Sequence, residues 1–187
     1  MDTYLLLLRG INVGGRNRLP MADLRVLLSG LGFADVATYL QSGNVVCTGS
    51  GRAGDVAERV ATAIADEMSL TVPVVARTSA EWATVIAGNP FAGVDDDPKR
   101  LHVTFLAGEP DPNRVNELMA ESGSFEPDKV AVVGPDVYLH VPRGYSDTGL
   151  QNAFLERKLG QVASTRNWRT VTALAELAGL PRTDRSS

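Results

Sequence analysis

The sequence predicts an α+β protein made of two small subdomains, and three observations support this fold class. Short apolar runs typical of strands alternate with segments whose apolar residues recur every three or four positions, as on a helix. The first half reads βαββαβ, and a related order, βαββαα, starts after an acidic break near residue 95. The 187 residues, 44% hydrophobic and 21% charged, can form ordinary cores without disulfides or metals.

The first subdomain is expected over residues 1–88. Strands are predicted at residues 4–9, 36–40, 45–48 and 72–77, where apolar and β-branched residues dominate. A helix should start at Pro20, which suits a first turn, and end at Gly32. Its buried stripe would be Met21, Leu24, Leu28 and Leu31, and further helices are expected over about 56–69 and 79–87. The order βαββαβ describes a ferredoxin-like domain.

The second, smaller subdomain is expected over residues 101–179, after a linker at 89–100 that loses periodicity and gains Gly, Pro and Asp. Its strands are predicted at residues 101–106, 130–133 and 137–141. Its helices are predicted at about 112–121, 148–159 and 168–178. The two halves share a rhythm of elements but no residue-level repeat, and residues 180–187 should form a flexible tail.

The first strand is apolar at every position from Leu5 to Leu8. A sheet with one solvated face alternates apolar and polar residues along its strands. We therefore expect both faces to be covered there, one by the first two helices and the other by the second subdomain or a partner subunit.

Composition excludes several classes of function. The net charge of −4, from 18 basic and 22 acidic residues, disfavours general binding to nucleic acid or a membrane surface. No apolar run approaches the ~18 residues of a membrane helix. A lone Cys47 excludes a disulfide scaffold and suits a cytoplasmic location. Two His and one Cys leave little for a zinc site, so neither metal nor cofactor is expected.

The segment from Arg9 to Arg18 is the most informative part of the sequence. It contains three Arg and no acidic residue, and its glycines, Gly14 and Gly15 among them, let amide groups converge on a ligand. Guanidinium groups suit phosphate and carboxylate, and the following helix adds a favourable dipole. The candidate ligand-binding residues of this loop are Arg9, Asn12, Gly14, Gly15, Arg16, Asn17 and Arg18. The alternative to a binding site is that this segment only connects the first strand to the first helix.

A second candidate segment is the turn formed by Gln41, Ser42, Gly43 and Asn44. In a ferredoxin-like sheet the first strand runs antiparallel to the third, so this turn should lie beside the Arg9–Arg18 loop. Gln41, Ser42 and Asn44 would then supply neutral donors and acceptors beside the arginines. Taken alone, the turn would be read as structural.

The third candidate is the approach to the last helix, where Arg166 and Asn167 would close the site if the subdomains fold together. The structural alternative is that Asn167 or Thr165 caps that helix. Cys47, His102 and His140 are interpreted as structural, and the three carboxylates at 95–97 as solvated.

Three blocks of sequence resemble the bacterial family catalogued as domain of unknown function 1697: residues 7–15, 21–24 and 38–46. Further matches lie at 89–91, 156–160 and 165–170. The resemblance implies a cytoplasmic protein with a ferredoxin-like first subdomain, and it supplies no activity. Arg16 stands where the family usually has Lys. Thr148-Gly149 stand where the family tends to have Ser-Lys, and the missing Lys puts a cationic role for the loop at 148–149 in doubt.

The sequence therefore favours a protein that binds a small anionic, phosphate-bearing ligand, and whether it is an enzyme stays open. Binding of RNA or single-stranded nucleic acid is one alternative, although the predicted sheet has few aromatics for stacking bases. A protein-interaction module is the other, with the apolar first strand at a homodimer interface.

Overall fold

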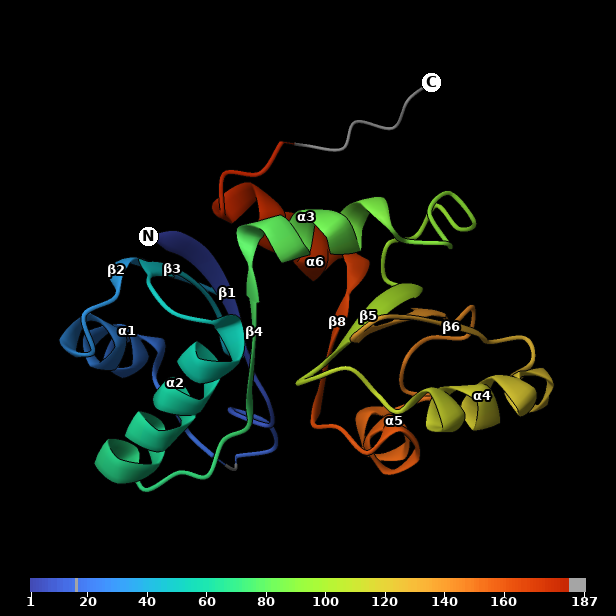
Figure 1. The fold of residues 1–187 in the computed structure, drawn as a ribbon, viewed down its shortest axis with the longest axis horizontal. Coiled ribbons are helices and arrows are strands. Elements are labelled where there is room, and N and C mark those ends of the chain that lie inside the picture. The colour runs from blue at the N-terminus through green and yellow to red at the C-terminus, as the bar shows by residue number, and fades with distance from the viewer. Residues whose placement is uncertain (16, 182–187) are drawn as a thin grey trace. The chain divides into compact units, whose positions relative to one another are not determined.

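The computed structural model describes residues 1–15 and 17–181. These residues form two compact units: Met1–Thr84 with the chain from Ala173 onward, and Val85–Thr172. In each unit helices cover one face of a four-stranded antiparallel sheet (Figure 1). This architecture confirms the predicted α+β class. The subdomain boundaries predicted from the sequence, with a linker at 89–100, stay a prediction. Residues 182–187 of the expected tail lie outside the described residues.

The first unit follows the predicted order and ends in a further helix. Its elements are β1 (Asp2–Leu8), α1 (Met21–Gly30), β2 (Ala34–Tyr39), β3 (Asn44–Gly49), α2 (Ala53–Met68), β4 (Val74–Thr78) and α3 (Ser79–Ala87), of which the residues up to Thr84 belong to this unit. The sheet order is β2-β3-β1-β4, so β1 is a central strand. This is the ferredoxin-like topology predicted from the sequence.

Strand β1 is buried on both of its faces, as its unbroken apolar run predicted. Leu6 and Leu8 pack into the core formed with α1 and α2, and the alternate residues Leu5 and Leu7 are equally buried. Since a strand points successive side chains to opposite faces, burial of all four requires cover on both sides. Directly after the strand, the backbone amide of Arg9 donates to Pro73 O at 3.0 Å, which holds the start of the following loop.

The second unit contains one more strand than the sequence predicted. Its elements are β5 (Leu101–Leu106), α4 (Pro112–Ala120), a 3-10 turn (Ser122–Phe125), β6 (Lys129–Val133), β7 (Asp136–His140), α5 (Asn152–Leu159), β8 (Ala163–Asn167) and the first half of α6 (Trp168–Leu177), which belongs to the first unit from Ala173 onward. The predicted order βαββαα is thus corrected to βαββαβα. The sheet order is β6-β7-β5-β8, and β8 pairs with β5.

Strand β8 escaped prediction because its sequence is mostly polar. Tertiary contacts stabilise it instead. The Thr165 hydroxyl lies 2.7 Å from that of Thr104 on β5 and donates at 2.7 Å to Asn152 Oδ1 at the start of α5. Paired hydroxyls of this kind satisfy the polar side chains of a half-buried strand. Local sequence carries no signal of these partners.

The two units repeat the same structure, with corresponding sheet orders and backbone contacts. The Leu8 amide donates to Gly43 O at 2.8 Å, and at the same place in the second sheet the Leu106 amide donates to Pro135 O at 2.9 Å. Leu5 pairs with Arg77 in one sheet as Val103 pairs with Arg166 in the other. This repeat was not apparent from the sequence, and it allows each position in one unit to be compared with its counterpart.

Candidate functional site

The loop between β1 and α1 lies directly against the turn between β2 and β3, as predicted. Asn12 Nδ2 donates to the backbone oxygen of Gln41 at 2.8 Å, and the Leu8 amide donates to that of Gly43 at 2.8 Å. Two segments far apart in the sequence therefore form one edge of the first unit. We call residues 9–15, 17 and 18 together with residues 40–44 the loop–turn edge.

Asn12 organises this edge through its side-chain amide. Its Oδ1 accepts from the Leu19 amide at 2.9 Å, while Nδ2 donates to Leu19 O at 2.9 Å as well as to Gln41 O. Its backbone adopts a φ of 54°, a left-handed conformation that asparagine tolerates better than most residues. The Asn12 amide group is thus used to shape the loop, although the sequence suggested that it would orient a ligand.

Other neutral residues of the edge also hold its shape. Asn17 Nδ2 donates to Gly10 O at 2.9 Å, and the backbone N–H of Asn12 donates to Asn17 O at 3.1 Å. These two bonds close the base of the loop. The buried Asn44 donates through Nδ2 to Tyr39 O at 3.0 Å and to Ser42 Oγ at 2.9 Å. Polar side chains therefore fix the backbone at both ends of the loop and in the neighbouring turn.

Gly43 makes the contact between loop and turn possible. A Cβ atom there would lie 2.6 Å from Leu8 Cβ and 2.7 Å from Ile11 Cδ1, and the residue has a φ of +73°. A side chain therefore fits neither the space nor the backbone conformation. Gly14 at the loop tip also has a positive φ, +57°, but a Cβ atom there would meet no atom of residues 1–15 and 17–181 within 4 Å.

The outer surface of the loop–turn edge is exposed and basic. Gly14, Gly15 and Arg18 are exposed and Arg9 is half-buried, while Arg16 lies outside the described residues. The sequence has no acidic residue between Asp2 and Asp23. Gly14, Gly15 and Arg18 are therefore accessible to a ligand and Arg9 is partly so, whereas nothing is described of Arg16.

The second unit has a different chemistry at the corresponding edge. There the β5–α4 connection spans only residues 107–111 and carries the exposed Glu109 and Asp111. Beside it lies a shallow cavity of about 260 Å³ lined by Glu109, Pro110, Pro112, Val115, Asn116, Val132 and Gly134. The same fold is therefore compatible with a short acidic connection, so a long basic loop is not a requirement of the topology.

Arg166 and Asn167 both have structural partners within the second unit. Asn167 Oδ1 accepts from the Thr170 amide at 2.9 Å and so caps α6, which was the structural alternative. Arg166 Nη1 donates to Ser164 Oγ at 3.0 Å and to Thr165 O at 2.9 Å. Desolvation lowers the pKa of its guanidinium to about 10. Participation of these two residues in ligand binding stays a prediction.

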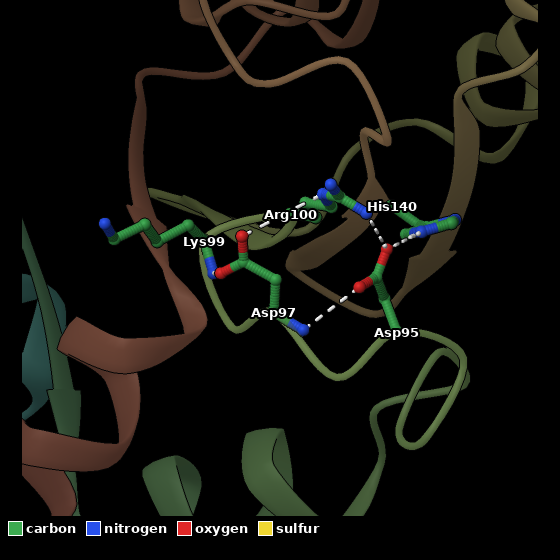
Figure 2. A network of polar contacts seen from close by, with 5 residues as sticks. All are labelled: Asp95, Asp97, Lys99, Arg100 and His140. Atoms are coloured by element: carbon green, nitrogen blue, oxygen red, sulfur yellow. Dashed lines mark hydrogen bonds and ion pairs between the residues drawn. The ribbon is translucent and has the colours of Figure 1, made fainter.

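A polar network around Asp95 was missed in the sequence, where residues 95–97 were interpreted as solvated. Figure 2 shows the Asp95 carboxylate between His140 and Arg100, with Oδ2 3.2 Å from His140 Nε2 and 3.4 Å from Arg100 Nη1. Asp95 Oδ1 also accepts from the Asp97 amide at 3.0 Å. That backbone bond, followed by the one to His140, lowers the pKa of Asp95 to about 2. The side chain is only 15% exposed.

The other titratable residues of interest are buried. Burial raises the pKa of the Cys47 thiol to about 12, and lowers that of His102, whose ring stacks on Tyr145 at a centroid distance of 4.8 Å, to about 4. Both groups are therefore uncharged at neutral pH. In the described part of the chain no three His, Cys, Asp or Glu residues gather as metal ligands.

Comparisons with known proteins agree with this fold. A family model described as "Protein of unknown function (DUF1697)" matches residues 1–138. Among solved structures, the conserved bacterial protein SP0830 from Streptococcus pneumoniae is 24% identical with a TM-score of 0.73, over 95% of this chain and 98% of that one. No curated protein matches. None of the helices in residues 1–15 and 17–181 has the length and apolar character of a membrane span.

Comparing alanine substitutions at Gly43 and Gly14 should separate the cost of steric overlap from the cost of backbone strain. We expect Gly43→Ala to lower the free energy of unfolding by about 1–3 kcal/mol more than Gly14→Ala, because it adds overlap with Leu8 and Ile11 to a similar positive φ. Gly14→Ala, which meets open space, should cost only about 1–2 kcal/mol. Urea denaturation measures both, and equal losses would show that the loop–turn contact is looser than described.

The network around Asp95 should make stability depend on acid. The pKa of Asp95 is about 2 in the folded protein, below the ordinary value of 3.8, so its ionisation stabilises the fold above pH ~4 and this contribution disappears as the pH falls through about 2. The melting temperature of wild type should exceed that of Asp95→Asn at pH 7, and the difference should shrink with acidification. A difference that stays constant down to pH 2 would contradict this role.

Proposed function

The chain belongs to the family of proteins of unknown function DUF1697, whose model covers most of its length, and we propose that it binds a small phosphate-bearing anion at the loop–turn edge. The arginines Arg9, Arg16 and Arg18 would contact the anion. Amides of the glycine-containing tip would contribute donors. Gln41 would supply a neutral contact from the neighbouring turn.

The observation that supports this proposal most is that hydrogen bonds fix the two ends of an exposed loop that carries arginines. Asn12 and Asn17 use their side chains to hold the backbone, and Asn12 makes three hydrogen bonds with the loop end and the turn. A loop whose shape is already fixed loses less conformational entropy when a ligand binds. Structural use of these amides is therefore consistent with a binding role for arginines of the same loop.

The repeat supplies a second argument. The corresponding edge of the second unit has the short connection 107–111 with Glu109 and Asp111 in place of a long loop with arginines. The fold can therefore form with a short connection at this place. The greater length and the positive charge of residues 9–18 are not explained by the fold. Long ordered loops on compact domains commonly carry function.

Base stacking on the first sheet receives no support from the strands. RNA-recognition sheets display aromatic side chains on their central strands. Here β3 contains no aromatic residue, and Tyr4 on β1 is fully buried in the core. The loop–turn edge is therefore a better candidate than the sheet face.

A charge-matched pair of variants tests the proposal. With inorganic phosphate and nucleoside monophosphates as probes, a ligand at ~100 times its dissociation constant should raise the free energy of unfolding by about 2.7 kcal/mol. Arg18→Gln should weaken that effect without unfolding the protein. Arg52→Gln is the control, because Arg52 is also exposed but follows Gly49, at the opposite end of β1 from the loop. Equal binding by both variants, or no binding by wild type, would refute the proposal.

A further inference from the structure

Two exposed apolar residues lie on the loop–turn edge among its polar groups. Val13 is 66% exposed and Leu40 is 57% exposed. Each is the chain neighbour of one partner in the hydrogen bond between Asn12 and Gln41 O, so both belong to the place where loop and turn meet. Single exposed apolar residues are common, but here two from different segments accompany the arginines.

Leu40 is unusual for a second reason. Its backbone has a φ of +59°, in the left-handed region where glycine and asparagine are favoured and a bulky residue is a rare outlier. An exposed leucine at such a position adds little burial to offset the backbone strain. Strained residues of this kind gather at ligand sites, where another requirement decides the side chain.

We infer that the ligand is a nucleoside phosphate, whose base lies against Val13 and Leu40 while its phosphate is held by Arg18; this inference rests on the proposed function. A nucleotide joins an anion to a flat apolar face. The loop–turn edge offers the complementary groups, namely the guanidinium of Arg18 and the apolar side chains of Val13 and Leu40.

Gln41 favours a base over a plain alkyl group as the apolar part. Its side chain is exposed beside Leu40, while its backbone oxygen is already used by Asn12. A side-chain amide offers a donor and an acceptor together, which match the edge of a base, as Gln does with adenine. An alkyl chain offers no donor or acceptor to that amide, which would then stay bonded to water. Leu40 and Gln41 would thus recognise the face and the edge of the same ring.

Four probes separate the parts of the ligand: inorganic phosphate, ribose 5-phosphate, AMP and UMP, each measured by isothermal titration calorimetry. We expect at least one of the two nucleotides to bind about tenfold more tightly than ribose 5-phosphate. Burial of part of a leucine and a valine side chain is sufficient for such a factor.

Leu40→Asn tests the residue that carries the inference. Asparagine adopts the left-handed conformation readily, so the turn should keep its fold while losing the apolar contact. Nucleotide affinity should fall about tenfold, and affinity for ribose 5-phosphate should stay within about twofold. Val26→Asn is the matched control, since Val26 on α1 is 73% exposed and should leave every affinity unchanged.

The outcomes distinguish this inference from the proposed function. If phosphate, ribose 5-phosphate and nucleotides bind equally and depend on Arg18, the anion site stands and the nucleoside inference is overturned. A nucleotide preference that survives Leu40→Asn also overturns it, because the base then lies elsewhere. If no probe binds, both proposals fail. Should Leu40→Asn instead abolish self-association seen by light scattering, with no nucleotide bound, the apolar pair is an interface between copies.

Discussion

The hydrogen bonds of the Asn12 side chain hold the loop–turn edge together, and the candidate site depends on them. One amide group joins the beginning of the loop, its end at Leu19 and the separate turn at Gln41. Each such bond contributes about 0.5–1.5 kcal/mol to stability, which helps to offset the strain of the left-handed residues nearby.

The first unit could be predicted well because its signals are local. The run Leu5 to Leu8, the stripe of α1 and the turn ending at Asn44 each contain the periodicity or turn residues of the element they form. Even the adjacency of loop and turn followed from topology alone. The roles of Asn12 and Asn44 did not, because a polar side chain in a loop looks the same in sequence whether it faces a ligand or a carbonyl oxygen.

The second unit shows where local signals fail. Strand β8 is held by the hydroxyl pair of Thr104 and Thr165, residues that are separated in the chain by two other strands and two helices. Asp95 is likewise fixed by His140, which no spacing motif connects to it. In both cases long-range partners determine the structure, and they become apparent only when the sheet has been assembled.

The burial of Cys47 has a practical consequence. The sequence contains no other cysteine, and this one is fully buried, with a pKa of about 12. Because thiolates and not thiols react with alkylating reagents, the native sulfur should remain inert under mild labelling conditions. A fluorophore or spin label can therefore be attached through a single cysteine introduced on the surface, with no need to remove the natural one first.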